Sequence, residues 1–157
     1  PQSTIFGSNA MAGSISLQTM DPSPIKKIHI LGTYGSDNTF HAGLSVNFPL
    51  RRSIMTRFTL FQGQSNGFRT NTFLNSNKSN NRSETMFRGK IRIFPKENLT
   101  IDISTIIANL DNGYDVWSPD NNVELETYSN KEGKDSQLTK SISSKKRTKR
   151  LKTTFVL

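Results

Sequence analysis

Three cationic side chains recur at every second position of one segment. Arg88, Lys90 and Arg92 alternate with apolar or small residues between positions 87 and 93. Side chains two residues apart share one face of a β-strand, so this segment is expected to present a row of cations on one face. Such a row can attract an anionic ligand. It can equally form ion pairs with carboxylates from another part of the protein.

A second group of candidate functional residues lies in segment 111–122. Tyr114 and Trp117 offer flat aromatic surfaces, and Asp115 adds a carboxylate between them. Aromatic anchors combined with a few polar groups suit the capture of a bulky ligand. We therefore predict a ligand-binding site at these three residues. The alternative is that the segment packs against its neighbours and only shapes the loop region.

No combination of residues in the sequence indicates catalysis or metal binding. Asp102 and Glu97 lie near one another, but one falls on a predicted strand and the other in a predicted turn, which argues against paired acid–base chemistry. The chain has no cysteine, and its two histidines, His29 and His41, are far apart in sequence. Metal sites usually cluster such ligands. We expect a protein that is not an enzyme and that holds neither a metal ion nor a cofactor.

The elements that position these residues are predicted to be β-strands. Apolar residues alternate with polar or small ones over several segments, and a period of two is typical of a strand with one apolar and one polar face. The clearest segments are 40–48, 87–93 and 99–107, weaker ones are Lys26–Tyr34 and Ile54–Gln62, and a last strand begins at Asp135. The pattern predicts an all-β fold with about six strands.

Several features favour strands of a transmembrane β-barrel over a sheet of a soluble protein. The predicted strands are about ten residues long, which fits a tilted membrane crossing. Short connections at Pro49–Ser53 and Pro95–Asn98 alternate with long loops at 64–83 and 109–134. Only 32% of residues are hydrophobic, and no apolar run is long enough for a transmembrane helix. We expect a partial antiparallel transmembrane β-barrel whose apolar face meets lipid; a soluble β-sandwich or barrel is the alternative.

Two stretches resemble a known family. Residues 1–13, Pro-Gln-Ser-Thr-Ile-Phe-Gly-Ser-Asn-Ala-Met-Ala-Gly, followed by an alternating stretch at 14–19 and by Asp21-Pro22, resemble the end of the plug domain of TonB-dependent outer-membrane receptors. The residues at 112–118, Asn-Gly-Tyr-Asp-Val-Trp-Ser, together with 133–137, are similar to the third long loop and following strand of iron-complex receptors in that family. The signature positions of the plug stretch are Pro1, Gly7, Asn9 and Gly13.

The resemblance implies that the chain is a fragment of such a receptor. Residues 1–22 would be the C-terminal end of the plug, and residues 23–142 the first strands of the barrel. The parent would take up an iron–siderophore complex across the bacterial outer membrane, with TonB acting through a plug segment that this chain lacks. Outer-membrane lipid would cover the apolar face. The alternatives are a porin or adhesin-type barrel without a plug, and a soluble β-rich binding protein.

Residues 143–157 form a strongly basic tail. Six cations fall between Lys145 and Lys152, and without them the formal charge of the chain would drop from +9 to +3. Six cations in a membrane strand would be very costly, so we expect the tail to be disordered or translated out of frame. A basic extension that binds anionic lipid is the alternative. No nucleic-acid partner is expected, since such runs are usually solvated.

Overall fold

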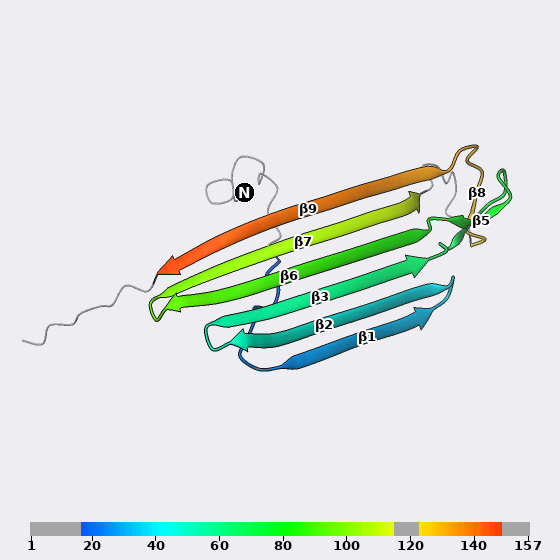
Figure 1. The fold of residues 1–157 in the computed structure, drawn as a ribbon. Coiled ribbons are helices and arrows are strands. Elements are labelled where there is room, and N and C mark those ends of the chain that lie inside the picture. Colours follow the sequence, from blue (N-terminus) through cyan, green and yellow to red (C-terminus); the bar gives the residue numbers. More distant parts are fainter. Residues whose placement is uncertain (1–16, 115–122, 149–157) are drawn as a thin grey trace, which may run out of the picture.

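The computed structural model describes residues 17–114 and 123–148, and within these ranges the protein contains strands and no helix. Six long strands form one antiparallel sheet in the order β1-β2-β3-β6-β7-β9 (Figure 1). The strands are β1 (Lys27–Gly35), β2 (Thr39–Arg51), β3 (Ile54–Ser65), β6 (Arg82–Lys96), β7 (Leu99–Tyr114) and β9 (Gly133–Thr148). The all-β prediction is confirmed, and the large sheet has the six antiparallel strands that were expected. In the described residues the sheet is open, with β1 and β9 at its edges, and neither a closed barrel nor a plug domain is seen.

The connections differ between the two ends of the sheet. Residues 52–53 and 97–98 form tight turns at one end, as the sequence predicted. At the other end a short turn joins β1 to β2, and its Asp37 and Asn38 adopt positive φ angles of 55° and 50°, which Asp and Asn tolerate better than most residues. The strands extend further into the predicted loops 64–83 and 109–134 than expected, because backbone pairing continues where both faces are polar.

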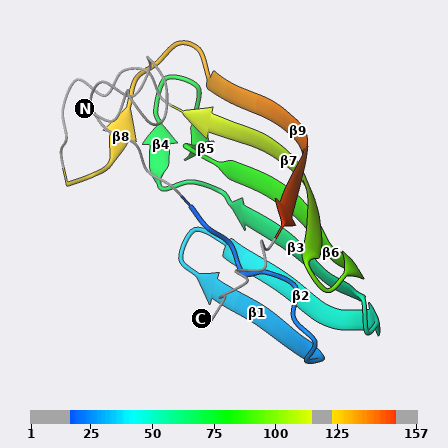
Figure 2. The ribbon, with the colours of Figure 1, turned by 90° about the vertical axis from the view of Figure 1, so that its left-hand side faces the viewer.

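A small second sheet forms where the two long connections meet. It has the order β5-β4-β8, with β4 (Arg69–Asn71) and β5 (Ser76–Ser79) from the first connection and β8 (Glu126–Thr127) from the second. Figure 2 shows these strands grouped at one end of the large sheet. The buried Asn71 holds the two connections together, since its side chain donates to the carbonyl oxygen of Ser129 at 2.9 Å. Sequence reasoning missed this sheet because its strands are too short to show a period of two.

The pairing register separates the residues of the large sheet into two faces. In one cross-strand row, Ile30, Leu44, Leu60, Phe87 and Ile107 are neighbours, which places the apolar positions of five strands on the same side. In the next row, His29, Ser45, Thr59, Arg88 and Ile106 share the opposite side. We call the first side the apolar face and the second the polar face.

The sheet has no enclosed apolar core in the described part of the chain. The largest side chains that are fully buried there are all polar: Asn47, Thr56, Asn71 and Thr127. Large apolar side chains are instead exposed on the apolar face, even on central strands, where Leu44 is 42% and Leu60 is 50% accessible. This distribution is the reverse of that in a soluble globular protein.

Strand β9 corrects the predicted boundary of the basic tail. We expected order to end near Ser143, but β9 pairs with β7 as far as Thr148. Lys145 lies opposite Asp102 on the polar face, and Arg147 lies on the same face because it is two residues further along the strand. These two cations therefore avoid the apolar face, whereas Lys146, opposite Ile101, lies on it. The out-of-frame origin of the tail remains a prediction.

Candidate functional site

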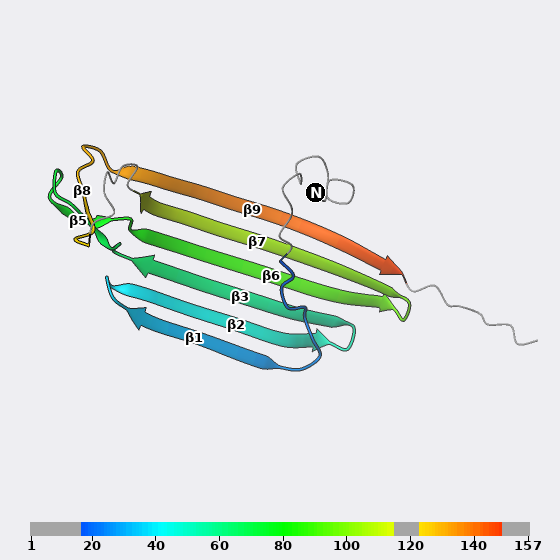
Figure 3. The same cartoon turned by 180° about the vertical axis from the view of Figure 1, so that it is seen from behind.

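The polar face is crossed by the segment that precedes β1. Residues 17–25, which we call the strap, run across the sheet before the chain turns into β1 (Figure 3). Arg88, Lys90 and Arg92 project from β6 on this face. The Lys90 ammonium group donates to the carbonyl oxygen of Thr19 at 2.9 Å and lies 3.2 Å from a carboxylate oxygen of Asp21. The predicted row of cations is thus present, and part of it binds the strap.

Arg92 links the strap to the next strands of the sheet. Its guanidinium contacts Asp21 at 2.7 Å and Asp102 of β7 at 2.5 Å. The second carboxylate oxygen of Asp102 lies 2.5 Å from the guanidinium of Arg147 in β9. The Arg92 side chain is 15% accessible and that of Asp102 23%, so water screens their pair less than a surface pair. Together, these ion pairs connect the strap with β6, β7 and β9.

The environment of Asp21 favours its ionised form. Hydrogen bonding from Arg92 lowers the pKa of the Asp21 carboxyl most strongly, and Lys90 lowers it further. Partial burial acts in the opposite direction and raises the pKa, but it does not cancel the two cations. Asp21 therefore stays charged at neutral pH and keeps its ion pairs with β6.

A buried asparagine fixes the other end of the strap. Asn47 of β2 is 1% accessible. Its amide nitrogen lies 3.0 Å from the carbonyl oxygen of Ser23 and 2.6 Å from that of Ile25, and its amide oxygen accepts from the Ser23 backbone N–H at 3.0 Å. One side chain thus satisfies several backbone groups of a segment that has no strand partner of its own. The strap is therefore held at two points, near Asp21 and near Ser23.

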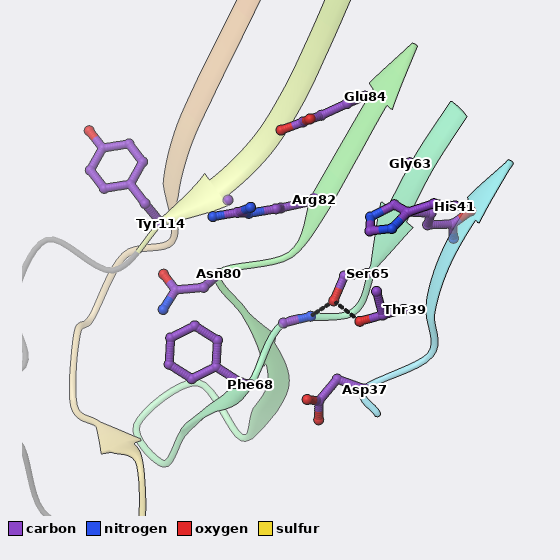
Figure 4. Close-up of a pocket in the computed structure, with 13 residues that line it drawn as sticks. Asp37, Thr39, His41, Gly63, Ser65, Phe68, Asn80, Arg82, Glu84 and Tyr114 are labelled. Carbon is purple, nitrogen blue, oxygen red and sulfur yellow. Dashed lines mark hydrogen bonds between the residues drawn. The ribbon is translucent and has the colours of Figure 1, made fainter. Parts of the chain in front are cut away.

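A hollow of about 520 Å³ opens on the polar face near the long connections (Figure 4). His41, Arg82 and Glu84 line it from the large sheet, while Phe68 and Tyr114 supply aromatic surface at the loop end. Hydrogen bonds from the Gly67 backbone and the Thr39 hydroxyl to Ser65 shape one wall. The hollow combines aromatic rings with charges of both signs, which suits a polar ligand with a flat or ring-shaped part.

The residues predicted from sequence fall into two groups. Tyr114 ends β7 and lines the loop-end hollow, and the three β6 cations share the polar face. The other predicted residues lie outside the described part of the chain: Asp115 and Trp117 of the aromatic segment, Pro1, Gly7, Asn9 and Gly13 of the plug signature, and residues 149–157 of the tail.

Sequence reasoning missed the partners of the β6 cations. Asp21 was noticed only as part of the plug resemblance, and Asp102 only as a carboxylate near Glu97 that did not indicate acid–base chemistry. Asn47 gave no signal, because an Asn at a polar position of an alternating strand is ordinary. The one usable indication was spacing: Asp102 follows Arg92 by ten residues across a short turn, which allows cross-strand pairing.

The described residues contain no helix long and apolar enough to cross a membrane. They also contain no group of three or more histidine or acidic side chains arranged to hold a metal ion. Comparisons with models of protein families, with curated proteins and with solved structures found no match to this chain.

Proposed function

We propose that this chain forms part of the wall of a TonB-dependent outer-membrane receptor, joined to the end of its plug domain. The observation that carries the proposal is the strap: a segment from the region that resembles a plug is bound across the polar face of a sheet whose other face is apolar and exposed. A protein of this kind transports and does not catalyse.

The apolar face supports contact with lipid. On β2 it extends from Phe40 to Leu50, about 33 Å along the strand at about 3.3 Å per residue. At a strand tilt of about 40° this spans about 25 Å, the height of the apolar band on outer-membrane barrels. The two bare edges, β1 and β9, would pair with further strands, because a sheet in a membrane must satisfy its backbone groups by closing.

The strap favours a plugged receptor over a porin or adhesin-type barrel. A barrel without a plug has no need to fix a segment across the wall of its lumen. Here the strap contacts β2 through Asn47 and β6 through Lys90 and Arg92. The strap thus fixes the chain on the polar side of the wall, the side on which a plug lies in such receptors.

The intact receptor would bind its ligand at the end of the sheet that carries the long connections. The loop-end hollow with Tyr114 and Arg82 would contribute to that site. An iron–siderophore complex, or a similar bulky ligand, would then pass through the barrel when TonB displaces the plug. The location of the protein would be the bacterial outer membrane.

Solute diffusion through the intact parent protein tests the proposal. Proteoliposomes that contain it should not swell in an isotonic arabinose solution, since a plug closes the lumen. Removal of the residues before the strap should create a channel and cause swelling. Swelling with the intact protein would instead support an open porin, and failure of the protein to insert into liposomes would support a soluble binding protein.

A further inference from the structure

One end of the large sheet is strongly basic. Residues 26–27, 51–53 and 96–98, which lead into β1 and form the β2–β3 and β6–β7 turns, make up this end, which we call the turn end (Figure 1). Its exposed cations are Lys26, Lys27, Arg51, Arg52 and Lys96. Glu97 is the one carboxylate in these three segments. At the loop end charges of both signs are mixed, and Lys134 pairs there with Asp111 at 3.3 Å.

Two of these cations lie on the apolar face, at the point where it ends. Arg51 is opposite Ile54 of β3, and Ile54 is opposite Ile93 of β6, so Arg51 extends a row of apolar-face residues. Lys96 is opposite Leu99 of β7, which lies on the same face. Arg51 is the last residue of β2 and Lys96 the last residue of β6. Positive charge thus begins where the apolar surface stops.

Neither cation forms an ion pair within the residues that the structure describes. Further parts of a receptor would not supply a partner on this side of the sheet. Both β2 and β6 are flanked by described strands, so additional barrel strands would pair only with β1 and β9. A plug would lie on the polar side. The surroundings of Arg51 and Lys96 are therefore set by what covers the apolar face.

We propose that Arg51 and Lys96 bind the phosphate groups of anionic phospholipids, such as phosphatidylglycerol, in the leaflet at the turn end. Long cationic side chains lay their stems along apolar surface and hold their charge at headgroup level, where anionic lipids attract them. The two strands are two spacings apart, about 10 Å, so each side chain can hold its own headgroup while acyl chains cover Ile54 and Ile93. The inference rests on the proposed function, since only a lipid-facing wall brings headgroups to this boundary.

Fluorescence quenching by brominated phospholipids tests the inference in the parent protein. One protein carries a fluorophore at Leu50→Cys, an exposed position next to Arg51, and another carries it at Phe40→Cys, on the apolar face at the loop end of β2. The vesicles contain equal amounts of phosphatidylglycerol and phosphatidylcholine, and one lipid at a time is brominated in its acyl chains. At low salt, phosphatidylglycerol should be enriched about fivefold or more near Leu50, and much less near Phe40. About 1 M salt should abolish the enrichment, because the Debye length falls to about 3 Å.

Charge variants assign the enrichment to the two side chains. Arg51→Gln combined with Lys96→Gln should bring the phosphatidylglycerol preference near Leu50 to within about twofold of none. Arg51→Lys keeps the charge and should keep the preference. Lys27→Gln is the matched control: it removes a cation from the same end of the sheet, but Lys27 lies opposite Asn47 on the polar face, so the preference should persist.

The possible outcomes separate this inference from the receptor proposal. Equal quenching by both lipids near Leu50, or an equal loss of preference in Lys27→Gln and the double variant, would overturn the lipid site and leave the receptor proposal standing. The salt dependence is measured on the unchanged side chains of the rim, so the test stays decisive if the double variant does not insert. Quenching of neither fluorophore by either lipid would show that the apolar face does not meet lipid, and both proposals would fail.

Discussion

Replacing Asn47 by alanine should release the strap from the polar face. The amide nitrogen has two hydrogens, which it shares among the carbonyl oxygens of Ser23 and Ile25 and the Ser23 hydroxyl. The amide oxygen accepts one further hydrogen bond from the backbone of Ser23. Alanine can form none of these bonds.

The expected loss of docking free energy follows from the hydrogen bonds that the Asn47 amide can form at one time, two as a donor and one as an acceptor. Three bonds at about 1 kcal/mol each give about 3 kcal/mol for the docking of the strap. The ion pairs of Asp21 contribute less, because its side chain is 42% accessible and exposed pairs are worth about 0–1 kcal/mol. Asn47 should therefore dominate the attachment, and its loss should shift the docking equilibrium about a hundredfold.

Hydrogen exchange at the Ser23 amide measures this effect directly. In the unchanged parent protein this N–H is bound to Asn47 and should be protected. Asn47→Ala should speed its exchange about a hundredfold. Ser45→Ala is the control: Ser45 lies on the same strand as Asn47, and its loss removes a polar-face hydrogen bond to Thr59 of β3 but should leave exchange of the Ser23 amide unchanged. Unaltered exchange in Asn47→Ala would refute the account of the strap.

Three further predictions concern the strap, the faces and the edges. Pairing lowers the pKa of Asp21, so the stabilisation of the strap by Asp21 is complete above the ordinary pKa of about 3.9 and is lost as the pH falls through the lowered pKa. A spin label at Met20→Cys should therefore become mobile on acidification, and Asp21→Asn should remove this pH dependence. Val46→Arg should destabilise the membrane-inserted parent protein by about 2–4 kcal/mol in a folding titration, because Val46 lies on the apolar face. Ser45→Arg, one residue away on the polar face, should cost little. Equal losses of stability in the two variants would contradict the assignment of faces. The chain alone should form heterogeneous oligomers in detergent through the bare edges of β1 and β9; a discrete monomer that shifts on a gel upon heating would contradict this.

The strands and their faces could be predicted from sequence because both follow from local alternation. The segments 40–48 and 99–107 show the period of two directly, and the register of β2 and β7 places their apolar residues on one side. A period of two fixes the face of every residue in a strand once one of them is known. Alternation along 87–93 predicted in the same way that Arg88, Lys90 and Arg92 share one polar face.

The contacts between distant segments could not be predicted. The pairing of Asp21 with Arg92 joins residues 71 apart, and the anchoring of Ser23 by Asn47 joins residues 24 apart. No repeating pattern encodes either contact. The end of β9 was misjudged for a related reason: apolar alternation stops after Ile142, but backbone pairing with β7 and the carboxylate of Asp102 continue the strand.

The orientation of the sheet in a membrane is the most direct test of the central claim. The chain has no native cysteine, so single cysteines can carry spin labels without background. In the parent protein in lipid bilayers, labels at Leu44 and Leu60 should be accessible to oxygen dissolved in the lipid. Labels at Ser45 and Thr59, the adjacent residues on the polar face, should respond instead to a water-soluble nickel reagent or be shielded by the plug. Access of lipid-dissolved oxygen to Ser45 equal to its access to Leu44 would contradict the assignment of the apolar face to lipid.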